Sequence, residues 1–332
     1  MGSLFVSVIV PAYNAERTVE RCLEALTGQN YPKDLYEVIL VDDGSTDKTG
    51  EIVGRYPVKY IRQENKGPAT ARNKGVEAAK GGIILFTDSD CVPEANWIEE
   101  MVRPFNSPEV AAVKGAYRAG QAGIVARFSQ VEFEERFEML KKADSIDMVD
   151  TYSAGFRRDI FLKMGGFDTG FPVANNEDTE LSYRMSRLGL KMVFNPDAAV
   201  CHLNHPDSIK RYARIKFWRG CWRMVVYKRF PEKMIRDTYT PQTLKLQTLL
   251  GLGMVFCIPL ALVSPLISIY IFAFAAPCFV LISIPFIVLA LKKDPQIVPF
   301  VLFLLLLRAV SIGSGALWGC IPGISNDPCD YK

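Results

Sequence analysis

Hydrophobic residues follow two different patterns along this chain, and the change comes near residue 245. Before that point, short apolar runs alternate with segments whose apolar residues recur at helical spacing, as Val19, Cys22, Leu23 and Leu26 do. Strands that alternate with helices indicate βαβ units and a largely parallel α/β sheet. The predicted strands lie within residues 6–14, 38–47, 58–61, 82–90 and 110–117, of which the run in 82–90 is expected to be buried on both faces, and predicted helices include 68–79 and 94–103.

The second pattern is almost continuously apolar. Residues 246–291 contain no charged side chain. As a helix this stretch would measure roughly 70 Å, about twice the ~30 Å hydrocarbon core of a bilayer. We therefore expect two membrane spans, near 244–264 and 267–291, with the chain reversing near Pro259 and Pro265.

A third apolar stretch, 297–320, has Arg308 as its only charge, so about three spans are expected within 244–320. The lysines at 292–293 and the basic region before residue 245 put both flanks of the first hairpin on the cytoplasmic side. We expect an integral protein of the plasma membrane with a cytoplasmic N-terminal domain and an external polar tail, 321–332. Arg308 could snorkel, pair with a lipid phosphate or line a groove, and a structural or lipid-contact role is favoured over catalysis.

Residues 206–243 form a basic segment with interleaved aromatic side chains. Ile215, Trp218, Trp222 and Val225 recur at helical spacing beside basic residues, a pattern typical of an interfacial amphipathic helix. Basic and aromatic residues also suit nucleic acid. A helix that leads directly into membrane spans favours anionic lipid instead, so membrane lipids are expected as partners and nucleic acid is not.

Composition adds two constraints. At 332 residues, of which 49% are hydrophobic, the chain has room for a catalytic domain with a full core in addition to the membrane region. Its eight cysteines show no CxxC spacing, which argues against a zinc site and fits reduced thiols in a cytoplasmic domain and in membrane spans.

Paired carboxylates follow two of the predicted strands. Asp88 and Asp90 end the run GIILFTDSD, and Asp42 and Asp43 end VILVDD. Ligands of open α/β sheets bind at the carboxyl ends of the strands, where two carboxylates can share a divalent cation that carries a diphosphate. The alternative is that these residues only form turns and cap the next helices.

The ordered set of motifs VSVIVPAYN, VDDGSTD, NKGPATARNKG and TDSD resembles the nucleotide-binding half of a family 2 glycosyltransferase with the GT-A fold. No GxGxxG follows the first strand, so a dinucleotide-binding interpretation lacks its phosphate loop. The resemblance implies a GT-A domain over 1–205, with a nucleotide half at 1–117 and an acceptor half at 118–205. It also implies a nucleoside diphosphate sugar as donor and a divalent cation, Mn²⁺ or Mg²⁺.

The resemblance assigns the donor side residue by residue. Asp90 would be the principal metal ligand, and Asp88 would meet the ribose or the metal. Arg72 would lie near the base or the diphosphate, and Asp42 or Asp43 would hydrogen-bond the base or the ribose. The residues that would hold the base are Pro11, Ala12 and Tyr13. These assignments have alternatives: Tyr13 could be a surface aromatic at a turn, Asp43 a turn former and Arg72 a solvated helix charge.

The acceptor side lies further along the chain. Residues 151–171 and NNEDTELSYRMSRLG, 175–189, resemble the acceptor-binding segment and the ED motif of the family. By resemblance, Asp178 is the general base and Glu177 its neighbour, and the alternative is a helix cap with first-turn carboxylates. The candidate buried positions of the following helix are Leu181, Tyr183, Met185 and Leu188.

His202 is a further candidate. Neutral imidazole suits a transition-metal cation, so His202 could be a third metal ligand or a diphosphate contact. A structural histidine with satisfied hydrogen bonds is the alternative interpretation, and it applies equally to His205.

The function expected from these observations is inverting, metal-dependent transfer of one sugar to a hydroxyl of a lipid-linked or glycan acceptor at the cytoplasmic membrane face. The resemblance supports inversion, and the segment RIKFWRG stands where processive members carry QxxRW. Three alternatives stay open: a processive polysaccharide synthase, a polyprenyl-phosphate glycosyltransferase, and a degenerate GT-A scaffold in a polysaccharide assembly complex. The oligomeric state stays undetermined.

Overall fold

The computed structural model describes residues 4–171 and 176–321. The chain forms two compact units, which we name by their main content. The sheet unit comprises residues 1–120 and 140–205, and the helical unit comprises 121–139 and 206–332. The predicted tail lies outside the described residues from position 322 onward.

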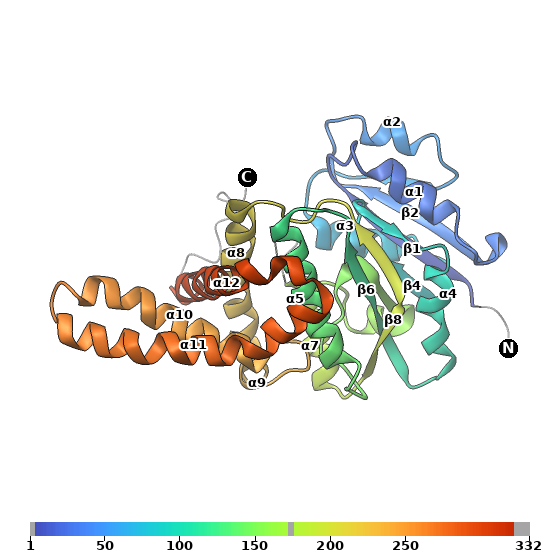
Figure 1. Ribbon diagram of the computed structural model, residues 1–332. Helices are drawn as coiled ribbons and strands as arrows, with labels where there is room; N and C mark the ends of the chain where they lie inside the picture. Colours follow the sequence, from blue (N-terminus) through green and yellow to red (C-terminus); the bar gives the residue numbers. More distant parts are fainter. Residues whose placement is uncertain (1–3, 172–175, 322–332) are drawn as a thin grey trace. The chain divides into compact units, whose positions relative to one another are not determined.

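The sheet unit is built on one eight-stranded sheet with the strand order β3-β2-β1-β4-β7-β6-β8-β5. Figure 1 shows these strands with the helices of the unit beside them. The strands are β1 (Val6–Ala12), β2 (Tyr36–Asp42), β3 (Lys59–Arg62), β4 (Ile83–Phe86), β5 (Cys91–Pro93), β6 (Val110–Ala119), β7 (Ala154–Arg157) and β8 (Lys191–His202). The helices are α1 (Val19–Thr27), α2 (Thr49–Val53), α3 (Pro68–Glu77), α4 (Trp97–Val102), α6 (Arg158–Lys163) and α7 (Glu177–Arg187).

The first four strands pair in parallel, as the alternating pattern predicts. Every residue of β1 and of β4 is buried, which agrees with strands covered on both faces. Helix α1 buries the four residues that the helical spacing selected. In α3, a Cβ on Gly75 would lie 2.4 Å from Cγ2 of Ile9, so the absence of a side chain lets this helix pack closely on β1.

The other half of the sheet is mixed. Strand β7 runs antiparallel to both β4 and β6, whereas β6 and β8 pair in parallel and β5 pairs antiparallel with β8. The parallel pattern therefore ends at β4, and the whole sheet is a mixed α/β sheet of GT-A type. One predicted buried position is wrong: Leu188 is 67% exposed, because α7 ends at Arg187 and Leu188 belongs to the turn that follows.

The helical unit contains three helices that are long and apolar enough to cross a membrane, at Gln242–Leu260, Pro265–Lys293 and Pro295–Gly319. They agree with the three spans predicted from the sequence, and the first two, α10 and α11, run as a hairpin (Figure 1). The helices of this unit are α5 (Ile124–Leu140), α8 (Ile209–Arg229), α9 (Pro231–Ile235), α10 (Gln242–Leu260), α11 (Pro265–Lys293) and α12 (Val298–Gly319).

Residues 121–139 were expected within the acceptor half, at 118–205, but they group with the helical unit. The reason is a buried ionic contact. Glu132 of α5 accepts hydrogen bonds from Lys216 of α8 at 2.9 and 3.1 Å and from Arg308 of α12 at 3.1 Å. Arg127, also on α5, pairs with Asp294 after α11. Helix α5 is therefore held by charges that belong to the C-terminal helices.

Arg308, the single charge of the third span, is 1% exposed. Besides Glu132, it donates to Oε1 of Gln247 on α10 at 2.7 Å, and Nε2 of Gln247 donates to Ser283 of α11 at 3.0 Å. Of the roles left open by the sequence, these contacts correspond to the structural one, since an intramembrane charge is tolerated when protein groups pair with it.

Helix α8 differs from the predicted amphipathic pattern. Lys216, expected on the polar face, is 5% exposed, and the buried positions of the helix include Tyr212, Gly220 and Val226. The helix packs against α12 through glycines: a Cβ on Gly315 would lie 1.9 Å from the backbone oxygen of Phe217. Small residues let two helix backbones approach closely, so α8 uses this face for packing on a candidate span.

Candidate active site

The carboxyl ends of β1 and β2 lie next to each other, since Ala12 pairs with Asp42 in the register of the two strands. Pro11 and Ala12 are buried, whereas Tyr13 is 49% exposed directly after the strand. An exposed aromatic ring at a strand end is compatible with the predicted stacking on a base. The three residues thus lie together at the edge of the sheet where the resemblance puts the donor base.

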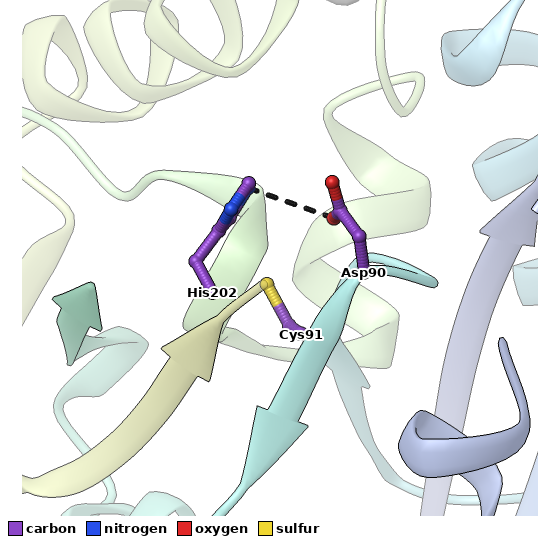
Figure 2. Close-up of side chains that lie close together, drawn as sticks. All are labelled: Asp90, Cys91 and His202. Carbon is purple, nitrogen blue, oxygen red and sulfur yellow. Dashed lines mark ion pairs between the residues drawn. The ribbon is translucent and has the colours of Figure 1, made fainter. Parts of the chain in front are cut away.

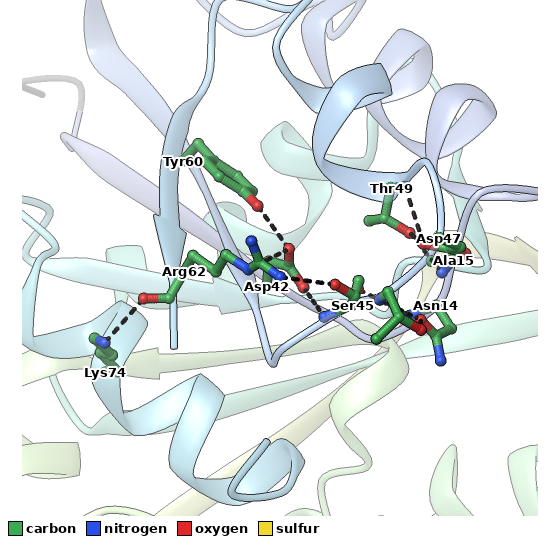
Figure 3. A network of polar contacts seen from close by, with 10 residues as sticks. Asn14, Ala15, Asp42, Ser45, Asp47, Thr49, Tyr60, Arg62 and Lys74 are labelled. Atoms are coloured by element: carbon green, nitrogen blue, oxygen red, sulfur yellow. Dashed lines mark hydrogen bonds and ion pairs between the residues drawn. The ribbon is translucent and has the colours of Figure 1, made fainter. Parts of the chain in front are cut away.

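The loop after β1 is fixed to the loop after β2 by hydrogen bonds (Figure 3). The backbone N–H of Asn14 donates to Oγ of Ser45 at 2.9 Å, and Thr46 N–H donates back to Oδ1 of Asn14 at 2.9 Å. Asn14 adopts a φ of +47°, in the left-handed region that asparagine tolerates better than most residues. The role of the turn at residues 44–46 in fixing the two loops was not predicted. The asparagine that follows Tyr13 could have indicated it, because asparagine is frequent at left-handed turn positions.

Asp42 and Asp43 are 1% and 4% exposed, and protein donors contact both carboxylates. Asp42 accepts from the backbone N–H of Ser45 at 2.8 Å and from the hydroxyl of Tyr60 at 2.6 Å. Asp43 accepts from Gln63 and from backbone N–H groups at 66 and 67, at 2.7 to 2.9 Å. The two carboxylates thus shape the loops around the expected base position, and direct contact of either one with a nucleotide stays a prediction.

A hollow of about 540 Å³ lies beside these loops. It is lined by Gly44, Arg62, Gln63, Glu64 and Asn65. Gly44, which follows the two aspartates, has a φ of +81°. A Cβ at this position would lie 2.9 Å from the backbone nitrogen of Asn65, so a glycine is needed both for the turn and for the close approach of the two loops.

Arg72 joins the two carboxylate motifs of the sheet unit. Its Nη2 donates to Oδ1 of Asp88 at 2.8 Å and its Nη1 donates to Oε1 of Glu177 at 2.7 Å. Arg72 and Glu177 are each 2% exposed. Burial alone would lower the pKa of Arg72, but the nearby carboxylates Asp88 and Glu177 raise it, so the arginine stays a cation. Segments 16 and 105 residues away from Arg72 are thereby brought to one point.

Glu177 and Asp178 begin helix α7. Burial, followed by the charge of Asp178, raises the pKa of Glu177 to about 7 against the opposing effect of Arg72. Asp178 is only half-buried, and its Oδ1 accepts from the backbone N–H of Thr179 at 2.7 Å. Among the described residues, the side-chain hydrogen bonds of Asp178 involve Oδ1, which leaves Oδ2 for an incoming proton.

A second group of side chains lies where β5 and β8 meet (Figure 2). Nε2 of His202 is 3.5 Å from Oδ1 of Asp90. One ligand atom from each of Asp90, Cys91 and His202 lies within 4.8 Å of the others. A carboxylate suits Mn²⁺ or Mg²⁺, whereas an imidazole suits a transition-metal cation, so the donor set fits Mn²⁺ better than Mg²⁺ among the cations that the fold implies.

The structure separates the two aspartates of TDSD. Asp90 lies beside His202, whereas Asp88 pairs with Arg72, and metal binding by Asp90 and His202 stays a prediction. The thiol of Cys91 was not predicted, because a single cysteine beside an acidic motif has no diagnostic spacing. His205 contacts the hydroxyl of Tyr117 through Nδ1, which agrees with a structural role for that histidine.

The mixed sheet of GT-A type, with carboxylates at the strand ends and Arg72 between them, agrees with the glycosyltransferase expected from the motifs. The comparison with known proteins gives the family. The model of "Glycosyl transferase family 2" matches residues 7–165, and the chain belongs to this family. It is an enzyme of the transferase class.

Two curated relatives illustrate the similarity. Glycosyltransferase AglE of Haloferax volcanii is 30% identical over 219 residues, which cover 64% of this chain and 71% of the relative. The probable glycosyltransferase YdaM of Bacillus subtilis is 31% identical over 235 residues, which cover 66% of this chain and 53% of the relative.

Among solved structures, the mannosyltransferase PcManGT from Pyrobaculum calidifontis, in complex with GDP-Man and Mn²⁺, aligns with a TM-score of 0.63. The alignment covers 97% of this chain and 89% of that chain at 21% sequence identity. At this identity the likeness concerns the fold. It extends beyond the sheet unit, since nearly the whole chain aligns.

Proposed function

We propose that this protein is a membrane-attached, inverting glycosyltransferase that transfers a single sugar from a nucleoside diphosphate sugar to a hydroxyl of a lipid-linked or glycan acceptor. The observation that carries the proposal is the ion-pair bridge Asp88–Arg72–Glu177, at 2.8 and 2.7 Å. It ties the donor motif TDSD to the acceptor motif ED. These two ion pairs support a single site in which the donor motif and the acceptor motif act together.

The base of the reaction is Asp178. As the acceptor oxygen attacks the anomeric carbon, the hydroxyl proton passes to Oδ2 of Asp178 while the bond between the sugar and the diphosphate breaks. Direct attack from the side opposite the diphosphate inverts the anomeric centre. Asp178 is half-buried, so a substrate can reach it, and the bond from Thr179 N–H orients its carboxylate.

Asp90 and His202 would hold the divalent cation, with Asp88 as the less direct partner. When bound, the cation would neutralise charge on the leaving diphosphate. Arg72 has a positioning role, because its two ion pairs hold Asp88 and Glu177 in place. Tyr13, with Pro11 and Ala12 at the end of β1, would receive the base of the nucleotide.

The three candidate spans support attachment to the plasma membrane, and the lysines at 292–293 favour a cytoplasmic sheet unit. A site on the same chain as membrane spans suits an acceptor that is itself anchored in lipid. A GT-A site that carries all its motif carboxylates favours an enzyme over a degenerate scaffold.

The test is a thermal-shift screen of nucleotide sugars on the full chain in detergent, with and without Mn²⁺. Ligand stabilisation grows with the ratio of ligand concentration to Kd, so a true donor raises Tm and does so only with the metal. The variant Asp90→Ala should lose the shift, while the exposed-site control Asp34→Ala should keep it. A metal-dependent shift that survives Asp90→Ala, or no shift with any nucleotide sugar, contradicts the proposal.

A further inference from the structure

Cys91 lies beside the proposed cation site, but the transfer reaction makes no use of it. Its side chain is fully buried, and it follows Asp90 directly in the chain. Figure 2 shows the thiol between the carboxylate of Asp90 and the imidazole of His202. The three ligand atoms lie within 4.8 Å of one another, close enough for one ion to contact all of them after small side-chain adjustments.

The backbone fixes this arrangement. Strands β5 and β8 are antiparallel, and their register pairs Cys91 with His202 directly. The backbone N–H of Leu203 donates to the carbonyl oxygen of Asp90 at 2.8 Å, which extends the pairing by one step. Ligand atoms that depend on paired strands are held more precisely than ligands on a loop, so the proximity of the thiol is a built feature of the site.

We propose that Cys91 gives the cation site a soft third ligand, so that thiophilic cations such as Zn²⁺, Cd²⁺ and Co²⁺ bind there more tightly than Mn²⁺ or Mg²⁺. The inference deepens the proposed function, because it concerns the same site. Oxygen and nitrogen donors accept all these cations, whereas a thiolate selects the softer ones. The thiol proton leaves to solvent as the metal–sulfur bond forms.

The site would therefore bind cations in two ways, with or without a bond to the sulfur of Cys91. Mn²⁺ would be held by Asp90 and His202 without a bond to the thiol of Cys91, which then keeps its proton. A thiophilic cation displaces that proton and gains the sulfur as a ligand. Such a cation competes with Mn²⁺ and should inhibit transfer at concentrations where Mn²⁺ alone supports it.

The direct test uses Co²⁺, whose bond to a thiolate gives a near-ultraviolet charge-transfer absorption. The full chain, freed of metal with a chelator and kept in detergent, is titrated with Co²⁺. The wild type should develop the absorption with one equivalent, and Cys91→Ser should lose it. Cys201 precedes His202 on β8 and pairs with Val92, so Cys201→Ser is the matched control and should keep the absorption.

Affinities provide the second readout. In Cys91→Ser, the Kd for Cd²⁺ should rise at least about tenfold, while the Kd for Mn²⁺ should change less than about threefold. If Cys91→Ser does not fold, His202→Gln serves instead, since it should weaken Co²⁺ binding but keep the charge-transfer absorption. The proposal is overturned if the wild type shows no such absorption, if the absorption persists in Cys91→Ser, or if Mn²⁺ and Cd²⁺ lose affinity equally.

The Co²⁺ and Cd²⁺ measurements require no nucleotide sugar. A protein that binds Co²⁺ through Cys91 but no donor with Mn²⁺ would contradict the proposed function alone. A protein that binds donor with Mn²⁺ and shows no cobalt–thiolate absorption would contradict the role of Cys91 alone.

Discussion

Arg72 in the sheet unit and Arg308 in the helical unit are each almost completely buried, but the net charge around them differs in sign. Arg72 in the sheet unit is 2% exposed and has Asp88, Glu177 and, further away, Asp178 around it. Arg308 in the helical unit is 1% exposed and shares the carboxylate Glu132 with the cation Lys216. The first cluster has an excess of negative charge, whereas in the second the cations Lys216, Arg308 and Arg136 outnumber the carboxylates Glu132 and Glu135.

The pKa values follow this difference. Burial, followed by the charge of the neighbouring Asp178, raises the pKa of Glu177 to about 7. Arg72 opposes this rise only in part, because it also pairs with Asp88. Burial alone would also raise the pKa of Glu132, but Lys216 and Arg308 reverse the effect and hold that pKa well below its usual range. Two protein cations therefore neutralise Glu132. Asp88, Glu177 and Asp178 have the single cation Arg72 among them, as expected where a bound cation completes the charge balance.

The largest effect is expected for Arg72→Met, which removes the one cation between Asp88 and Glu177. Breaking a buried ion pair from one side typically costs about 3–5 kcal/mol, because the remaining charge stays buried without compensation. We expect a loss of unfolding free energy in this range and loss of detectable sugar transfer, measured by chemical denaturation and by turnover. Arg55→Met is the matched control, since Arg55 pairs with Glu51 at the surface and should lose less than about 1 kcal/mol. Equal losses in both variants would contradict the comparison.

Glu132→Gln tests the opposite cluster and should have the next largest effect. It removes the carboxylate that Lys216 and Arg308 share and leaves only Glu135, at 4.0 Å from Arg308, so the helical unit should lose about 3 kcal/mol of unfolding free energy. Donor binding by the sheet unit should keep its Kd within about twofold, since no residue of the nucleotide site changes. Thermal unfolding in detergent and donor titration give the two numbers, and Glu134→Gln, which affects the more exposed pair with Lys293, is the control. Loss of donor affinity with unchanged Tm would reverse the assignment of the two clusters.

The smallest effect concerns the pH dependence of stability. The pKa of Glu177 is raised in the folded state from 4.5 to about 7, so its contribution to stability is fully present below pH 4.5 and is lost as pH rises through about 7. Glu177→Gln cannot ionise and should therefore flatten the decline of Tm between pH 5 and pH 8. Thermal scans of wild type and variant across this window provide the check. Parallel curves for the two proteins would mean that Glu177 titrates normally.

Much of the fold follows from local sequence. The runs that became β1, β2 and β4 are largely buried because aliphatic residues fill most of their positions, and the helical spacing of α1 selected its buried face correctly. The pattern could not show that β7 reverses the sheet direction, because a four-residue strand carries no sign of its orientation. Nor could it assign α5 to the helical unit, since the partners of Glu132 lie 84 and 176 residues away.

In the candidate site, too, contacts between residues far apart in the sequence were not predictable. The motif carboxylates were recognisable because their spacing is regular, and the structure pairs Arg72 with Asp88 and Asp90 with His202. Cys91 was not recognisable as a ligand, because its neighbour His202 is contributed by another strand. The packing of α8 on α12 was not predictable for a related reason: the glycines that allow the two helices to approach leave no apolar signal.

The most direct test of the account is the turnover of Asp178→Asn, with donor binding measured on the same sample. Asparagine keeps the size of the side chain but cannot take the proton of an acceptor hydroxyl, and general-base catalysis contributes about 10²- to 10⁴-fold. We predict a fall in kcat of this size, with the donor Kd and Tm close to those of the wild type. Turnover at the wild-type rate would contradict the role of Asp178 as the base, and with it the transfer to a hydroxyl acceptor.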